Sequence, residues 1–171
     1  MRHAFRYLFL ATLVTALAAL GVSAATAQTG FVDNVRTQAS NDQFVSGEVD
    51  LSEHTFTLSI DGIVARTMPA SMGKPGHETP VGTFPVLEKQ RNVVFDSRTI
   101  GIPLDDPEGY VINGEYAERL TWGGVYIHSA PWSVEQQGNS NVSHGCINLA
   151  PDDAAWVFDT LNVGDEITIH E

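Results

Sequence analysis

Residues 142–148 have the sequence VSHGCIN and contain Cys146, the single cysteine among the 171 residues of the chain. A cysteine can act as a nucleophile if a base takes its proton and donors stabilise the oxyanion that forms when it attacks a carbonyl. A free cysteine can also serve as a small buried hydrophobic residue. Residue type alone therefore leaves both a reactive role and a packing role open for Cys146.

His128 is the candidate base. It ends the strongly β-forming run GVYIH and precedes Cys146 by 18 residues, with a loop rich in Gly, Asn and Ser between them. Such a loop can fold back and bring imidazole and thiol together, but a histidine at a strand end can also simply hydrogen-bond to a loop. Gly145 permits unusual backbone dihedrals and exposes amide N–H groups, as a backbone oxyanion hole requires, although glycine is equally common in plain turns.

This part of the chain also contains three residues of types that can bind a metal ion, His128, His144 and Cys146. The His-x-Cys spacing differs from the paired spacing of structural zinc sites, and the sequence has no second cysteine. Further ligands would have to come from distant histidines, namely His54, His77 or His170. We therefore predict no metal and no cofactor at this site.

Chain order separates two other classes of cysteine enzyme from this sequence. Papain-like peptidases place the cysteine before the histidine, whereas here His128 comes first. Sortases place the histidine first but use an arginine after the cysteine, and no arginine or lysine follows Cys146. Both classes are therefore disfavoured.

The elements that must position these residues are mainly strands. The run TFTLSI alternates apolar and polar residues and is followed by an Asp-Gly turn, which predicts a hairpin with the next run, IVARTMPAS. FVSGEVDL, TFPVLEKQ, NVVFD, GVYIH and EITIH are further β-prone runs. Turn signals, DDPEG and NGE, lie between residues 105 and 124, and composition predicts loops over residues 72–82 and 129–143.

A single helix is predicted, at PDDAAWVFDTL, shortly after the cysteine. Pro151 suits the first helical position, and the two aspartates that follow it favour the positive end of the helix dipole. The apolar residues expected to share one face are Ala155, Trp156, Phe158 and Leu161. Many strands and one helix predict a mainly β domain, built as a β-sandwich or a barrel-like sheet.

Residues 1–27 predict a secretory signal peptide, because two arginines precede an apolar run that ends in the small residues Ala25 and Ala27. We expect cleavage after Ala27. The alternative is an uncleaved membrane anchor over residues 7–27, which approaches the roughly 20 residues of a bilayer span. Residues 28–43 are interpreted as a linker or tether. Either alternative places the domain outside the cytoplasm, in the cell wall or periplasm, where a lone cysteine has no disulfide partner in its own chain.

The formal net charge is −12, and removal of the two arginines, Arg2 and Arg6, with the signal peptide makes it −14. Such a surface repels phosphate backbones, and the sequence contains no basic stripe or cluster. These features argue against nucleic acid as a partner.

Two separate segments resemble the L,D-transpeptidases, the YkuD-like enzymes that cross-link peptidoglycan. YIHSAPWSVEQQGNSNVSHGCINLAP resembles their active-site segment, and its HSAPWSV, SHGC and Asn148 are closest to the actinobacterial branch. VDLSEHTFTLSIDGIVARTMPASMGKPGHETPVGTF resembles their opening hairpin and Gly-Lys-Pro-Gly loop. The resemblance extends over residues 45–170. It implies that residues 44–171 form an L,D-transpeptidase catalytic domain.

The resemblance also implies catalytic roles. Cys146 matches the nucleophile, and His128 matches the base that takes its proton. Ser129 matches the residue whose backbone carbonyl holds the imidazole in its working tautomer, so that no acidic third member is needed. Gly145 matches the turn that aims the thiol, and it is expected to assist the Cys146 amide as an oxyanion donor.

On the substrate side, Tyr110 matches a lid tyrosine whose hydroxyl can join the oxyanion hole, and His144 matches a residue of the turn before the nucleophile. Trp132 and Asn148 match residues that line the site, although Trp132 can instead pack beneath the loop and Asn148 can instead bond a turn. The sequence departs from the actinobacterial pattern in having Phe95 and Ile100 at the start of the lid, and Ala150 in place of a helix-capping serine.

The implied reaction joins the third residues of two peptidoglycan stem peptides through a cysteine thioester, with release of D-alanine. Carbapenem β-lactams are the implied covalent inhibitors. The alternatives within the enzyme class are an L,D-carboxypeptidase, with water as acceptor, and an enzyme that anchors a protein lysine to peptidoglycan. The alternative to an enzyme is a wall-binding module without catalytic activity. The presence of both His128 and Cys146 argues against such a module, because binding alone does not require this pair.

Overall fold

The computed structural model describes residues 43–171. The signal peptide predicted for residues 1–27, and nearly all of the linker predicted for residues 28–43, lie outside the described residues. Within residues 43–171 no helix has the length and hydropathy needed to cross a membrane.

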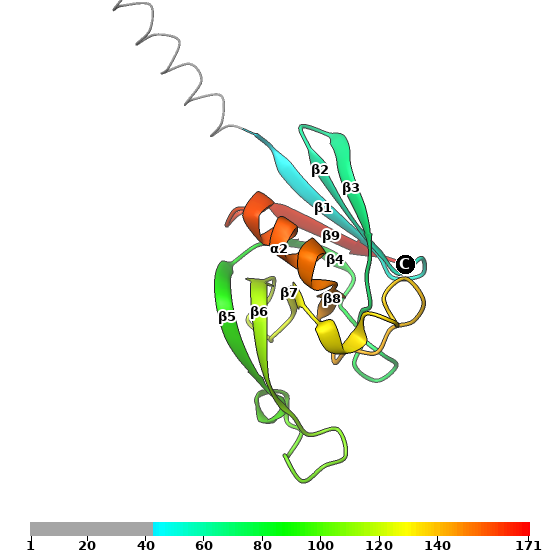
Figure 1. The fold of residues 1–171 in the computed structure, drawn as a ribbon, viewed down its shortest axis with the longest axis vertical. Helices are drawn as coiled ribbons and strands as arrows, with labels where there is room; N and C mark the ends of the chain where they lie inside the picture. Colours follow the sequence, from blue (N-terminus) through cyan, green and yellow to red (C-terminus); the bar gives the residue numbers. More distant parts are fainter. Residues whose placement is uncertain (1–42) are drawn as a thin grey trace, which may run out of the picture. The chain divides into compact units, whose positions relative to one another are not determined.

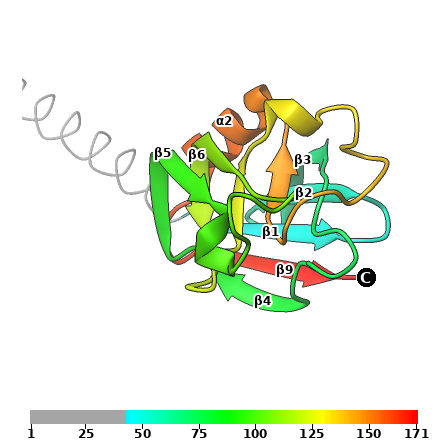
Figure 2. The same ribbon diagram turned by 90° about the horizontal axis from the view of Figure 1, so that it is seen from below.

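One sheet has five strands in the order β3-β2-β1-β9-β4. The hairpin predicted around the Asp-Gly turn is present, and β1 pairs antiparallel with β2 and parallel with the last strand, β9. Figure 2 shows β1, β9 and β4 side by side. The strands are β1 (Val45–Asp50), β2 (Thr55–Ile60), β3 (Ile63–Pro69), β4 (Gly82–Pro85) and β9 (Glu166–His170).

The second sheet has four strands in the order β5-β6-β7-β8, and β7 and β8 are parallel. Figure 1 shows β5 and β6 as a pair of long neighbouring strands. The strands are β5 (Glu88–Asp96), β6 (Val111–Arg119), β7 (Tyr126–Ser129) and β8 (Ile147–Leu149), and two short 3₁₀ helices are η1 (Ser97–Ile100) and η2 (Pro131–Ser133). Two sheets and one α-helix within residues 43–171 confirm the mainly β prediction.

The interpretation of NGE as a turn is wrong, because β6 occupies residues 111–119. Asn113 and Gly114 form no turn but pair with Val94 and Val93 of β5. A Cβ at Gly114 would lie 2.4 Å from the Phe95 ring, so glycine makes room there for an aromatic side chain of the neighbouring strand. Pairing with β5 therefore overrides the local turn signal.

The predicted helix is present as α2 (Pro151–Thr160), and it packs against β6 and β7 (Figure 1). The residues that it buries are Ala154 and Val157, together with Leu161 directly after it. The face predicted from the sequence is therefore correct only for Leu161, because its other members, Ala155, Trp156 and Phe158, are partly buried. Cationic side chains cover the two aromatic rings: the Arg66 guanidinium lies 5.0 Å from the centroid of the Trp156 ring, and Lys89 Nζ lies 4.5 Å from that of the Phe158 ring.

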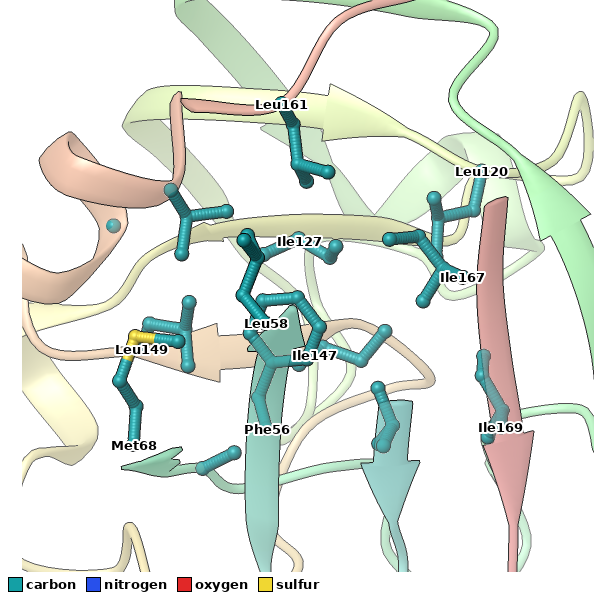
Figure 3. Packing of buried hydrophobic residues seen from close by; sticks show 14 of the residues in the cluster. Phe56, Leu58, Met68, Leu120, Ile127, Ile147, Leu149, Leu161, Ile167 and Ile169 are labelled. Carbon is teal, nitrogen blue, oxygen red and sulfur yellow. The ribbon is translucent and has the colours of Figure 1, made fainter. Parts of the chain in front are cut away.

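The core lies between the two sheets and α2, and Figure 3 shows its largest side chains together. The alternation predicted for β2 is correct, because Phe56 and Leu58 are fully buried. From the other sheet, Ile127, Ile147 and Leu149 enter the same cluster. Because side chains alternate along a strand, the residues between them face the opposite side of the sheet. That side carries His128 and Asn148, which are two of the candidate site residues.

Candidate active site

The parallel pair β7 and β8 sets the relative positions of His128 and Cys146. Ile127 pairs with Ile147 and His128 with Asn148, so Cys146, directly before β8, is level with Tyr126. Paired residues point to the same face of a sheet, and so do residues two apart along a strand. His128 and Cys146 are therefore diagonal neighbours on one face, and both line a cavity of about 450 Å³.

The imidazole of His128 has a defined tautomer. Its Nδ1 lies 2.8 Å from the carbonyl oxygen of Ser129, and because a carbonyl only accepts, Nδ1 carries the proton and donates it. Nε2 is then left with a lone pair. Burial lowers the pKa of His128 to about 4, against a smaller opposing effect of the Ser129 hydrogen bond, so the ring is neutral near pH 7. The Ser129 carbonyl lies where the resemblance implied.

Cys146 is partly accessible, and its sulfur lies in surroundings that favour the neutral thiol. Burial raises the pKa of Cys146 to about 11, and a backbone hydrogen bond from Tyr126 acts in the opposite direction. The thiol donates to the carbonyl oxygen of Gly124 at 3.5 Å. A neutral thiol and a neutral imidazole thus share the cavity, and proton transfer from sulfur must accompany attack on a substrate.

The turn before Cys146 is fixed from two sides. Gly145 has a φ of +112°, a conformation that only glycine adopts without strain. The Thr79 hydroxyl donates to the Gly145 carbonyl at 2.9 Å, and Ser143 Oγ donates to the Cys146 carbonyl at 2.6 Å. The Gly145 N–H donates to Ser143 Oγ at 3.1 Å, so the expectation that it is an oxyanion donor is not met here. Its role is to shape the turn.

Aromatic side chains enclose the imidazole. Phe95 of β5 lies 4.5 Å from the His128 ring and Trp132 of η2 lies 5.8 Å from it, measured between ring centroids. Trp132 is 48% exposed and lines the cavity. Phe95 and Ile100, the departures from the actinobacterial pattern at the start of the lid, both line the cavity.

Tyr110 and Asn148 also line the cavity. The Tyr110 ring lies 5.3 Å from that of His144, and its backbone N–H donates to the buried Ser97 hydroxyl at 3.0 Å. Burial is the main cause that raises the pKa of Tyr110, so its hydroxyl keeps its proton. Asn148 donates from Nδ2 to Ser133 Oγ at 3.0 Å, and its buried Oδ1 accepts no hydrogen bond within the described residues.

Comparison with known proteins identifies the fold that carries this site. A family model described as the L,D-transpeptidase catalytic domain, YkuD, matches residues 46–169. The chain belongs to this L,D-transpeptidase family. Its membership confirms the resemblance stated from the two sequence segments.

Several relatives of this L,D-transpeptidase domain come from mycobacteria, which agrees with the actinobacterial branch. L,D-transpeptidase 1 of Mycobacterium tuberculosis (strain ATCC 25618 / H37Rv) is 60% identical over 123 residues, which are 72% of this chain and 49% of the relative. The chain spans about half the length of the curated relatives it matches.

Solved structures agree with this assignment. An L,D-transpeptidase from Mycobacterium smegmatis superposes with a TM-score of 0.75 at 61% identity, covering 75% of this chain and 59% of that one. The L,D-transpeptidase LdtMt1 in complex with imipenem superposes with a TM-score of 0.74 at 58% identity and the same coverage.

Sequence reasoning missed the residues that hold this L,D-transpeptidase site in place. Thr79 and Gly145 are 66 positions apart, and no local pattern indicates that their groups meet. The signal that could have found Thr79 is the HETPVG segment, which the resemblance covers. Trp122, which is 75% exposed at the cavity, was missed because a single tryptophan in a turn has no periodicity.

The structure also corrects the view that His77 is distant from the site. Lys74 N–H donates to the Ser143 carbonyl at 2.9 Å, which brings the 72–82 loop against the turn before Cys146. The rings of His77 and His144 are consequently 4.7 Å apart. Glu108 lies between them and forms an ion pair with Lys74. His77, Glu108 and His144 are the candidate metal-ligating group among the described residues.

Proposed function

We propose that this chain is a peptidoglycan L,D-transpeptidase in which Cys146 is the nucleophile and His128 its base. The observation that carries this proposal is the shared cavity face of the two residues, with His128 Nδ1–H bound to Ser129 and Nε2 left to accept a proton. Family membership and the names of the relatives support it.

In the first step the thiol leaves the Gly124 carbonyl and transfers its proton to His128 Nε2 as the sulfur attacks a carbonyl carbon. The attacked carbonyl joins the third, diamino-acid residue of a tetrapeptide stem to its terminal D-alanine. The Cys146 backbone N–H and the Tyr110 hydroxyl stabilise the oxyanion. The carbon–nitrogen bond then breaks, and His128 returns the proton to the leaving D-alanine amine.

In the second step the side-chain amine of another stem's third residue attacks the thioester. His128 Nε2 takes a proton from that amine, and the departing sulfur recovers it, so the resting thiol is restored. The cross-link joins the third residues of two stems. Phe95 and Trp132, which lie against the imidazole, limit access of water to the thioester.

The substrate test is incubation of the purified protein with a disaccharide-tetrapeptide. We expect free D-alanine together with a cross-linked dimer, detected by mass spectrometry. Release of D-alanine without dimer would identify the carboxypeptidase instead, and transfer only to an added lysine-bearing protein would identify the anchoring enzyme. His128→Ala should abolish both products, and full activity of that variant would remove His128 as the base.

We further propose that the domain acts outside the cytoplasm, in the cell wall or periplasm, after a signal peptide ends at Ala27. The support is the sequence pattern of residues 1–27. N-terminal sequencing of the protein secreted by an expressing bacterium should begin at Gln28. Recovery of the intact chain from the membrane fraction would instead identify an anchor, and recovery from the cytosol would contradict export.

A further inference from the structure

Three side chains meet at the rim of the active site with the spacing of metal ligands. His77 Nε2 lies 3.5 Å and His144 Nε2 lies 3.4 Å from Glu108 Oε2, and the three ligand atoms all lie within 4.8 Å of one another. Tetrahedral zinc with bonds of 2.0–2.2 Å places neighbouring ligand atoms roughly 3.3–3.6 Å apart. Hydrogen bonds to a carboxylate are shorter, at about 2.7–2.9 Å.

His144 supplies a second observation. Its Nε2 atom is inaccessible to solvent and has no hydrogen-bond partner in residues 43–171, although buried polar atoms normally have one. A buried imidazole nitrogen without a partner is available to bind a metal ion.

Glu108 is oriented by a neighbour that leaves one of its oxygens free for a cation. Lys74 Nζ pairs with Oε1, whereas Oε2 faces the two imidazoles. Outer partners of this kind fix the orientation of a ligating carboxylate. Two imidazoles and one carboxylate suit zinc, whereas Mg²⁺ and Ca²⁺ prefer ligand sets made of oxygen alone.

We propose that His77, Glu108 and His144 form a Zn²⁺ site, with the fourth position left for water. The three ligands come from three different segments: His77 from the 72–82 loop, Glu108 from the 97–110 segment that leads to Tyr110, and His144 from the turn before Cys146. Bound Zn²⁺ joins these segments. It thereby fixes the segment that leads to Tyr110, which lines the same cavity as Cys146.

The binding test uses Zn²⁺ and the full chain carrying Cys146→Ser, because the thiol is itself a zinc ligand. Isothermal titration should show one equivalent of Zn²⁺. In that background, His77→Gln and Glu108→Gln should each weaken binding at least tenfold. His170→Gln is the matched control, since His170 is an exposed histidine that also pairs with a glutamate, at 2.8 Å, and it should leave binding unchanged. Absence of binding, or equal binding after His77→Gln and Glu108→Gln, would overturn the site.

A spectroscopic test applies to the protein with its cysteine intact. Co²⁺ replaces Zn²⁺ in such sites, and a cobalt–thiolate bond gives an intense near-ultraviolet charge-transfer band. We expect visible cobalt bands without that charge-transfer band, and their loss in His77→Gln. A thiolate band that persists in His77→Gln would place the metal on Cys146 and contradict the proposed ligands.

Discussion

At the scale of single residues, the site depends on how the peptide group between Gly145 and Cys146 is held. Thr79 donates to the carbonyl of this peptide, and the N–H of the same peptide belongs to Cys146. Fixing one end of a rigid, planar peptide fixes the direction of the other. Thr79 is therefore a positioning residue for the amide that we assign to the oxyanion.

Thr79→Val should lower kcat about tenfold and leave KM nearly unchanged in the disaccharide-tetrapeptide assay, because misplacement of an oxyanion donor weakens transition-state binding selectively. Thr79→Ser, which keeps the hydroxyl, should restore most of the rate. The matched control is Thr83→Val on β4, which removes an exposed hydroxyl paired with Thr168 of β9. Equal kinetics of Thr79→Val and wild type would show that the bond has no positioning role.

At the scale of elements, the local signals that gave correct predictions were those of amphipathic strands and of a helix start. The apolar–polar alternation of β2 predicts a strand, and the proline and aspartates at the start of α2 predict a helix. Both signals depend only on residues that are neighbours in the sequence, so the sequence alone is enough to detect them. β6 was missed because its Asn-Gly pair is a turn signal that pairing with β5 overrides. The parallel pairing of β7 and β8 is non-local, and it decides which face His128 and Cys146 share.

The start of α2 offers a test at this scale. Ala150 occupies the N-cap with extended dihedrals and forms no side-chain cap. Ala150→Ser should supply a hydroxyl to an unpaired N–H of the first turn and raise the free energy of unfolding by about 0.5–2 kcal/mol. Denaturant titration measures the change. Ala155→Ser inside α2 is the control and should give no gain; an equal gain there would remove capping as the cause.

At the scale of the whole molecule, the fold buries one carboxyl group that the site does not use. Glu118 of β6 is fully buried, and both of its carboxyl oxygens lack hydrogen-bond partners within residues 43–171. Burial raises the pKa of Glu118 to about 9, against a smaller opposing effect of Lys89. Glu118 is therefore protonated in the folded chain and ionised in the unfolded chain at neutral pH.

The contribution of Glu118 to stability should consequently fall as pH rises. Because the raised pKa of Glu118 belongs to the folded state, its contribution is fully present below pH 4.5 and is lost as the pH rises to about 9. The slope is about 1.4 kcal/mol per pH unit for one proton. Glu118→Gln should remove this slope while keeping the shape of the side chain, as measured by denaturant titration at pH 5 and pH 8. Identical slopes for the variant and wild type would contradict the assignment.

Whole-molecule topology also explains why the site was only partly predictable. The motif around Cys146 and His128 is contiguous enough to be recognised, and the family model agrees with it. Thr79, Glu108 and His77 reach the site only because the 72–82 loop and the 97–110 segment fold against the turn at 143–146. Such long-range contacts have no local sequence signature.

The central claim is that Cys146 is the nucleophile. A relative is known in complex with imipenem, so this β-lactam is the chosen probe. Intact-protein mass spectrometry of the imipenem-treated chain should show one covalent adduct, and peptide mapping should place it on Cys146. Cys146→Ser should show none. An adduct on another residue, or no adduct on a folded wild-type chain, would contradict the account.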